Sequence, residues 1–246
     1  MISLKSEEEI RLMKKAGRIV KKALDDLEGC IRPGIMTKEL DRRVEKLIKK
    51  EGGIPAFKGY KGFPGNICTS INDVVVHGIP KKKAIKAGDI VSIDIGVMYQ
   101  GYYADSARTL KVGNISDAAR KLIDITKESL FVGINEARAN ERLSNISHAI
   151  QRFIESHGYN VVRALVGHGI GSKMHEDPEV PNYGQPNKGI LLKPGMTLAI
   201  EPMVNQGGYE VEVLDDGWTV VTKDGKLSAH FEHTILITES EPEILT

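Results

Sequence analysis

The spacing of hydrophobic residues predicts two amphipathic helices near the start of the chain. Ser6 and Glu9 have the spacing of a capping box, and the pattern that follows them predicts a helix that ends at Gly29. A second helix is expected to begin after Thr37 and to end at Gly52. The predicted apolar faces consist of Ile10, Met13, Ile19 or Val20, Ala23, Leu24 and Leu27 in the first helix, and of Leu40, Val44, Leu47 and Ile48 in the second.

Clusters of β-branched residues between glycine-containing breaks predict strands after these helices. In the first half we expect them at residues 67–70, 74–76 and 90–95, with a turn at 97–104 that leads into another strand. The order then repeats, and helices near 116–135 and 144–157 precede strands near 161–165, 197–200, 211–214, 218–222 and 231–238. Asp224-Gly225 is a typical hairpin turn and is expected to join the last two strands.

One local match supports an internal repeat. The segments Gly88–Asp94 and Gly195–Glu201 each place a glycine before an apolar strand that ends on a carboxylate. Taken alone, this match is equally compatible with two ordinary turn and strand units, since glycine before a strand is a common turn signal. The order of helices followed by strands in both halves predicts an α/β fold of the α+β kind, with halves at about 1–113 and 114–246.

Composition narrows the functional classes. The chain has 34 lysines and arginines against 33 aspartates and glutamates, and this balance argues against electrostatic binding to nucleic acid or to an anionic membrane. No segment has the length and apolar character of a signal peptide or a membrane span, and only Cys30 and Cys68 are present. We therefore expect a cytoplasmic protein.

Four acidic residues lie where carboxylates are rarely found. Asp94, Glu201 and Glu232 adjoin or lie within apolar predicted strands, and Asp105 follows two tyrosines and an alanine. A single such acid is commonly a solvated edge residue or part of a salt bridge. Four of them together would repel one another unless a cation lay among them. The set therefore predicts a centre for divalent metals, with enough oxygens for two ions and a shared water that is deprotonated near neutral pH.

Three histidines also attract attention. Gly167-His168-Gly169 places an imidazole on a predicted loop where the backbone can approach a ligand closely, His77 lies in the segment Val75–Pro80, and His175 lies in the segment Met174–Pro178. Structural or surface roles are expected for His148 and His157, while His230 and His233 flank Glu232 and are ambiguous, with a structural or supporting role favoured over ligation. The chain contains no complete dinucleotide fingerprint, phosphate-binding loop, His-Glu-x-x-His motif or Gly-x-Ser-x-Gly elbow.

At these residues the sequence closely resembles the type I methionine aminopeptidases, which have the pita-bread fold. The matching segments are Asn72–Pro80, Ser92–Gly96, Asp105, Gly167–Gly171, His175–Pro178, Ala199–Pro202 and His230–Thr234. The resemblance implies a single catalytic domain over residues 1–246, in which two pseudo-symmetric αβ halves form a central curved, mainly antiparallel sheet with helices on its outer face. The chain departs from the family at 137–145, where the family usually has a Pro-Gly turn.

The resemblance also implies roles for individual residues. It assigns metal ligation to Asp94, Asp105, His168, Glu201 and Glu232. Glu201 is the expected general base, His77 is expected to contact the amine or scissile nitrogen, and His175 to stabilise the carbonyl and its oxyanion. The residues expected around the methionine side chain are Tyr60, Phe63, Cys68, Met174 and Trp218, although ordinary core packing explains Cys68 and Met174 equally well.

The implied reaction is removal of the initiator methionine from nascent proteins with a small second residue, by attack of a hydroxide that bridges two divalent ions. Co, Mn, Fe and Zn all suit such a ligand set. The implied enzyme is a monomer whose partners are nascent polypeptide N-termini, and transient contact with the ribosome stays open. Two alternatives are a catalytically inactive pita-bread module that binds peptides or ribosomes, and an X-Pro dipeptidase of the same fold.

Overall fold

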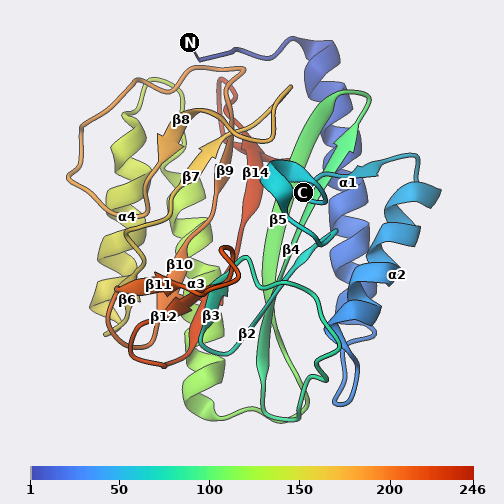
Figure 1. Cartoon of the computed structure of the whole chain (residues 1–246). Helices are drawn as coiled ribbons and strands as arrows, with labels where there is room; N and C mark the ends of the chain where they lie inside the picture. Colours follow the sequence, from blue (N-terminus) through green and yellow to red (C-terminus); the bar gives the residue numbers. More distant parts are fainter. Residues whose placement is uncertain (1) are drawn as a thin grey trace.

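The computed structural model describes residues 2–246, in which helices lie outside a set of antiparallel strands (Figure 1). The helices are α1 (Glu7–Glu28), α2 (Thr37–Lys50), α3 (Asp117–Asn135) and α4 (Leu143–Ser156), and a short 3-10 turn, η1, spans Tyr60–Gly62. The predicted capping box of α1 is confirmed, because Ser6 Oγ accepts the Glu9 N–H while Glu9 Oε2 accepts the Ser6 N–H at 2.7 Å. The predicted bounds of the other three helices agree with the structure within two residues.

The longest strands of the described chain form one hairpin. β4 (Ile90–Tyr99) turns at Gln100-Gly101 into β5 (Tyr102–Lys111), and the two strands pair along their whole length. The other edge of β4 pairs with β1 (Ile54–Pro55) and β2 (Cys68–Ile71). Helices α1 and α2 pack on this sheet and bury a core that includes Leu24, Val44, Ile93 and Ile95.

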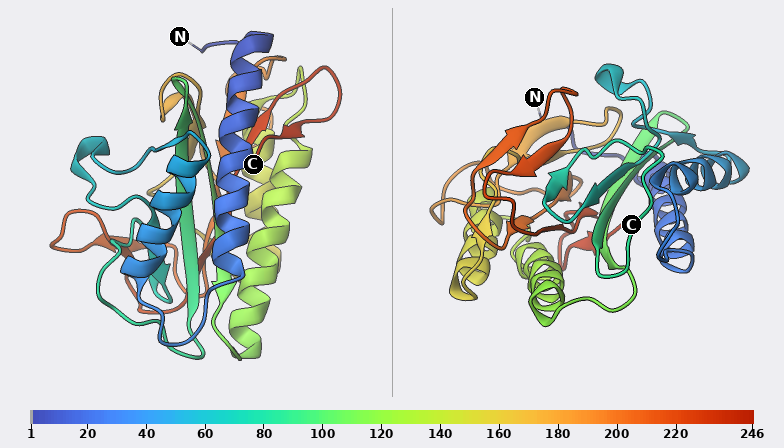
Figure 2. Two further views of the ribbon diagram at one scale, coloured as in Figure 1. Left: turned by 90° about the vertical axis from the view of Figure 1, so that its right-hand side faces the viewer. Right: turned by 60° about the horizontal axis from the view of Figure 1, so that its bottom comes forward.

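The second half is built around a five-stranded sheet in the order β15-β14-β9-β7-β8. Its strands are β7 (Gly167–Gly169), β8 (Glu176–Val180), β9 (Thr197–Ile200), β14 (His233–Leu236) and β15 (Glu243–Ile244). Helices α3 and α4 share a second core with it, in which Ile146, Ile150, Leu198 and Ile235 are buried. The right-hand view of Figure 2 shows the four helices along the outside of the strands, so the predicted antiparallel sheet structure with outer helices is confirmed.

Two small sheets complete the structure. One has the order β13-β10-β6, with β6 (Asn160–Val161), β10 (Met203–Asn205) and β13 (Ser228–His230). The other has the order β11-β12-β3, with β3 (Val74–Val76), β11 (Val211–Val213) and β12 (Val220–Thr222). Because β3 belongs to the first half of the chain and β12 to the second, this sheet joins the two halves. That the halves form an internal repeat stays a prediction.

The hairpin predicted across Asp224-Gly225 is wrong. β12 pairs with β11 and β3, whereas the next strand, β13, pairs with β10. Asp224 instead ties its turn to another loop, since its carboxylate accepts the Gly208 N–H at 2.9 Å and the Lys226 N–H at 3.1 Å.

Several predicted strands are shorter than expected, and two of these lie next to the residues that line a cavity. The strand predicted at 161–165 ends at Val161, and the irregular segment after it lines a cavity. The strand predicted at 231–238 covers only His233–Leu236, so Glu232 precedes it. The backbone breaks there because the Glu232 N–H donates to Ala107 O in β5 at 3.0 Å. Among residues 2–246, no helix has both the length and the apolar character needed to span a membrane.

We predict that Gly17→Ala lowers the free energy of unfolding by about 1–3 kcal/mol. A Cβ at this position in α1 would lie 2.0 Å from Leu245 O, so the helix would have to move away from the C-terminal segment. Urea unfolding in the presence of a chelator measures the effect. Gly29→Ala is the matched control, because its Cβ would meet nothing closer than 3.7 Å. Equal stability of the two variants would contradict close packing of α1 on the segment that follows β15.

Candidate metal centre and active site

The five residues expected to bind metal all line one cavity of about 310 Å³. They come from both halves: Asp94 lies on β4, Asp105 on β5 and His168 on β7, while Glu201 directly follows β9 and Glu232 directly precedes β14. Residues far apart in the sequence therefore contribute to one wall, because the long β4–β5 hairpin of the first half lies beside the five-stranded sheet of the second (Figure 1).

His168 lies on a strand, which corrects the prediction of a loop. β7 pairs with β8 on one side and with β9 on the other. The two flanking glycines make this possible, since a Cβ at Gly167 would lie 2.4 Å from Ala199 O and one at Gly169 would lie 2.2 Å from Asp177 O. The glycines therefore allow backbones to pack closely beneath the imidazole. The sequence had instead suggested that they allow the backbone to approach a ligand.

The donor atoms of the cluster converge. His168 Nε2 lies 3.7 Å from Asp105 Oδ2 and 3.5 Å from Glu201 Oε1. Asp105, His168 and Glu232 each offer one ligand atom within 4.8 Å of the others, and all three residues are buried. His168 Nδ1 is 2.8 Å from Gly169 O, which can only accept, so Nδ1 carries the hydrogen. The lone pair of Nε2 is therefore directed among the carboxylates, as a metal ligand requires.

The carboxylates are electrostatically frustrated in the absence of a cation. Burial raises the pKa of Asp94 and of Glu201 well above the ordinary value, and the neighbouring acids raise both further. Burial and the same neighbours also raise the pKa of Glu232 well above its usual range. Burial raises the pKa of Asp105 to about 6, although nearby His175 and the Thr234 hydroxyl act in the opposite direction. Such shifts arise where charged groups lack solvent and counter-charge.

These residues fit a metal centre. Among residues 2–246, Asp94 Oδ1 is buried and has no hydrogen-bond partner, as is expected of an atom whose natural partner is a cation. Other groups hold the ligands in place: Thr234 Oγ1 donates to Asp105 Oδ1 at 3.1 Å, and Asn182 Nδ2 donates to the backbone O of Glu201 at 3.0 Å. Four carboxylates and one neutral imidazole form a donor set suited to divalent first-row metals.

His77 and His175 line the same cavity. His175 Nδ1 lies 2.9 Å from the Tyr60 hydroxyl, and its ring centroid is 4.1 Å from that of His168. Burial and the nearby His168 lower the pKa of His175 to about 4, so the imidazole is neutral at neutral pH. Burial also lowers the pKa of His77, which adopts a φ of +59° and lies edge-on to Trp218 with ring centroids 6.4 Å apart.

The residues expected around a methionine side chain form the rest of the wall. Tyr60, Phe63, Cys68, Met174 and Trp218 all line the cavity, and the rings of Phe63 and Trp218 meet edge-to-face at 5.2 Å. Sequence reasoning missed several further lining residues, among them Phe57, Lys61, Val76, Ala164, Leu165, Val166 and Met203.

A signal for some of the missed residues was present in the sequence. Leu165 and Val166 directly precede Gly167-His168 in the sequence, so their closeness to His168 along the chain was a signal that they lie near the site. Gly96 was a second signal, because its missing side chain leaves room for Phe57: a Cβ at Gly96 would lie 2.5 Å from the Phe57 ring and 2.9 Å from Met174 Cε. The histidines for which structural or surface roles were expected are not among the residues that line the cavity; His148, for example, contacts Gly184 O through Nδ1 at 3.0 Å.

Comparison with known proteins agrees with this centre. Residues 11–239 match the model of metallopeptidase family M24. The chain belongs to this family. It is 58% identical to methionine aminopeptidase 1 of Bacillus subtilis and 57% identical to a methionine aminopeptidase of Clostridium perfringens, in each case over 100% of this chain and 99% of the relative.

Solved structures of M24 relatives have the same fold. A methionine aminopeptidase from Thermotoga maritima superposes with a TM-score of 0.99 at 49% identity, covering 100% of this chain and 99% of that one. A prolidase from Pyrococcus horikoshii gives a TM-score of 0.80 at 28% identity, but the match covers only 63% of that chain. The predicted pita-bread fold is thereby confirmed, and the chain is a metallopeptidase of the aminopeptidase type.

We predict that Asp105→Asn stabilises the metal-free protein at pH 7 by on the order of 1–3 kcal/mol. The pKa of Asp105 is about 6 in the folded protein, which is higher than in the unfolded chain. The native state therefore binds more protons than the unfolded state between about pH 4 and pH 6, and the protein loses stability as the pH rises through this range. The gain from Asn should therefore shrink as the pH falls from 7 towards 4. Urea unfolding with chelator at several pH values measures it.

Asp124→Asn, at an exposed position on α3, is the control and should show no such pH-dependent gain. A destabilised Asp105→Asn protein at pH 7 would contradict the frustrated state of the metal-free cluster.

Proposed function

We propose that the protein removes the N-terminal methionine from nascent proteins with a small second residue in the cytoplasm, as a metal-dependent monomer. The observation that carries the proposal is that buried acids and His168 share one cavity with a wall of aromatic and sulfur-containing side chains. Such a wall suits a flexible thioether. The names of relatives 57–58% identical over the whole chain support the same substrate.

Asp94, Asp105, His168, Glu201 and Glu232 are the proposed metal ligands, and their four carboxylates provide enough oxygens to hold two divalent ions of Co, Mn, Fe or Zn. Ions held there would polarise the scissile carbonyl and lower the pKa of a bound water. The free α-amine of a substrate, held next to this cluster, would restrict cleavage to the first residue of a chain. The raised pKa values of the metal-free carboxylates support the need for cations.

Glu201 is the proposed general base. Its carboxylate lies 3.5 Å from His168 Nε2 at the centre of the cluster, where it can take a proton from the attacking water and pass it to the leaving amine.

His175 is the proposed donor to the carbonyl oxygen as negative charge develops on it. Burial raises the pKa of Tyr60, so its phenol keeps its proton and can donate to His175 Nδ1, 2.9 Å away. The neutral imidazole then carries its hydrogen on Nε2, the atom left to donate. His77, which lines the same cavity with its ring edge-on to Trp218, is proposed to hold the scissile nitrogen.

The first experiment is release of free methionine from Met-Ala-Ser by chelator-stripped protein reloaded separately with Mn(II), Co(II), Fe(II) or Zn(II). We expect metal-dependent release, and a loss of at least about 10²-fold in Glu201→Gln. Glu212→Gln, an exposed acid on β11, is the control. Metal content is measured in each variant, because Glu201 is also a proposed ligand. No release with any metal would favour the inactive module, and faster cleavage of X-Pro dipeptides would favour the dipeptidase.

We further predict that His175→Ala lowers kcat by about 10²–10³-fold and changes KM little, because a donor to the transition state is removed. Steady-state kinetics with Met-Ala-Ser measures the two constants. His148→Ala, on α4 and away from the cavity, should behave like the unaltered protein. A change confined to KM would count against a role in stabilising the oxyanion.

A further inference from the structure

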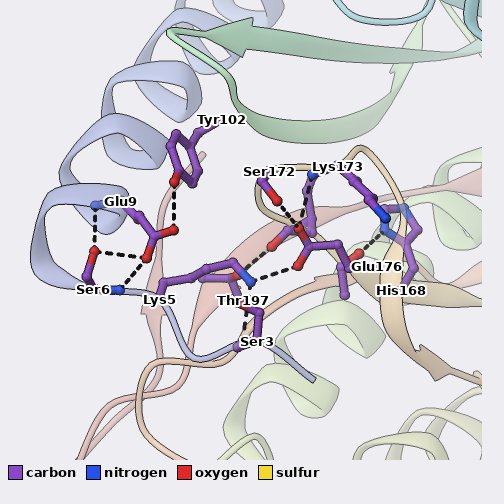
Figure 3. Close-up of polar contacts among 12 residues, drawn as sticks. Ser3, Lys5, Ser6, Glu9, Tyr102, His168, Ser172, Lys173, Glu176 and Thr197 are labelled. Atoms are coloured by element: carbon purple, nitrogen blue, oxygen red, sulfur yellow. Dashed lines mark hydrogen bonds and ion pairs between the residues drawn. The ribbon is translucent and has the colours of Figure 1, made fainter. Parts of the chain in front are cut away.

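The segment before α1 lies against the loop that carries His175 (Figure 3). The Lys5 N–H donates to Gly195 O at 2.8 Å, which attaches this segment to the turn before β9. Its side chain is only 3% exposed, and lysine is almost never buried to this extent unless its charge is paired. The capping box of α1 is formed by Ser6 and Glu9, so it does not account for the burial of the Lys5 side chain.

Lys5 is paired with Glu176. Lys5 Nζ lies 2.7 Å from Glu176 Oε2, and the glutamate side chain is 12% exposed. The second carboxylate oxygen, Oε1, accepts the Lys173 N–H at 3.0 Å and the Ser172 hydroxyl at 3.2 Å (Figure 3). Burial alone would raise the pKa of Glu176, but the hydrogen bonds from Lys5 and Lys173 bring it below its ordinary value. One carboxylate thus joins the N-terminal segment to residues 172–176.

Gly171 allows this arrangement. A Cβ there would lie 2.1 Å from Lys5 Cε and 2.8 Å from Glu176 Oε1, so the lysine crosses directly over the backbone. The same residue is fixed on both sides: its N–H donates to Lys173 O at 3.0 Å, and its O accepts the Tyr103 N–H at 2.8 Å. The loop 171–176 is consequently held between β5, its own hydrogen bonds and Lys5.

His175 is the residue next to Glu176. Glu176 begins β8, and successive side chains of extended backbone point in opposite directions. The carboxylate accordingly faces Lys5 while the imidazole faces the cavity, where it meets Tyr60 and His168. A shift of the Glu176 backbone would move the imidazole with it.

We infer that Lys5 is a positioning residue for His175: its ion pair with Glu176 holds loop 171–176 where the imidazole reaches the scissile carbonyl. The inference rests on the proposed function of His175. It assigns a catalytic consequence to the N-terminal segment, whose charged contact lies outside the cavity wall.

Lys5→Met tests the inference, because methionine keeps most of the aliphatic length over Gly171 and removes the charge. In the metal-loaded enzyme acting on Met-Ala-Ser we expect kcat to fall about 10–100-fold with KM within about twofold, as for a misplaced catalytic group. Lys14→Met is the matched control, since it removes the lysine of an exposed ion pair, Lys14–Glu243, from α1. It should leave both constants unchanged.

A double-mutant cycle separates positioning from general damage. In a His175→Ala background, Lys5→Met should have almost no further effect on kcat, because the group that it positions is gone. An equal loss in both backgrounds would overturn the inference. If Lys5→Met fails to fold with Glu176 unpaired, Lys5→Met/Glu176→Gln removes both charges while keeping an acceptor for the loop, and it should still lower kcat.

A second readout does not depend on activity. In protein with 15N-labelled histidine, the imidazole resonances of His175, identified by their loss in His175→Ala, should shift in Lys5→Met and not in Lys14→Met. Unchanged resonances would overturn the inference even if the enzyme proved inactive. An inactive unaltered enzyme whose His175 resonances respond to Lys5→Met would instead refute the proposed function while retaining the structural tie.

Discussion

Mutual repulsion among buried carboxylates is the constraint on which the rest of this structure depends. Burial raises the pKa of Asp94, Asp105, Glu201 and Glu232, and the neighbouring acids raise it further for all of them except Asp105. A flexible chain would relieve such strain by moving the acids apart. Here each acid lies on or directly beside a paired strand, so the sheets hold the charges together and leave a cation as the means of relief.

The sheets can do this because each half of the molecule has its own core. The helices α1 and α2 bury one face of the β4–β5 hairpin, and α3 and α4 cover the sheet that contains β9 and β14. The two sheets meet at the cavity. The first core therefore fixes Asp94 and Asp105, and the second fixes His168, Glu201 and Glu232. Glycines at 96, 167 and 169 let backbones and bulky side chains approach one another there, and a methyl group at any of them would meet an atom within 2.5 Å.

Sequence alone predicted much of this arrangement, and its errors have physical reasons. The helices follow from strong periodicity and from the capping box at Ser6, which are local signals. The wrong hairpin at Asp224-Gly225 arose because a turn motif says nothing of the partner that each flanking strand finds. The strand at His168 is only Gly167–Gly169, so no propensity reveals it, and tertiary contacts alone decide it.

The candidate site was easier to foresee than the strands that build it. Each acid next to an apolar run has an ordinary explanation when taken alone, but the four together predicted a metal centre, and the family resemblance added His168 as a ligand. The metal-ligand assignments and the roles of His77, His175 and the pocket residues stay predictions. The contribution of Lys5 could not be read from the sequence, because a lysine two residues ahead of a helix is ordinarily solvated, and only the fold brings it to Glu176.

The contact between Gly17 and Leu245 has a consequence for the biogenesis of this chain. Most of the apolar face of α1 is covered by α2, β4 and β5, but Gly17 packs on Leu245, so this one contact closes only after both halves of the described chain have been synthesised. Contacts with such large sequence separation form slowly, and the proposed donor set, which extends from Asp94 to Glu232, is likewise shared between the two halves. The last packing of α1 and the binding of metal by the proposed ligands therefore both require the second half of the chain to be folded against the first.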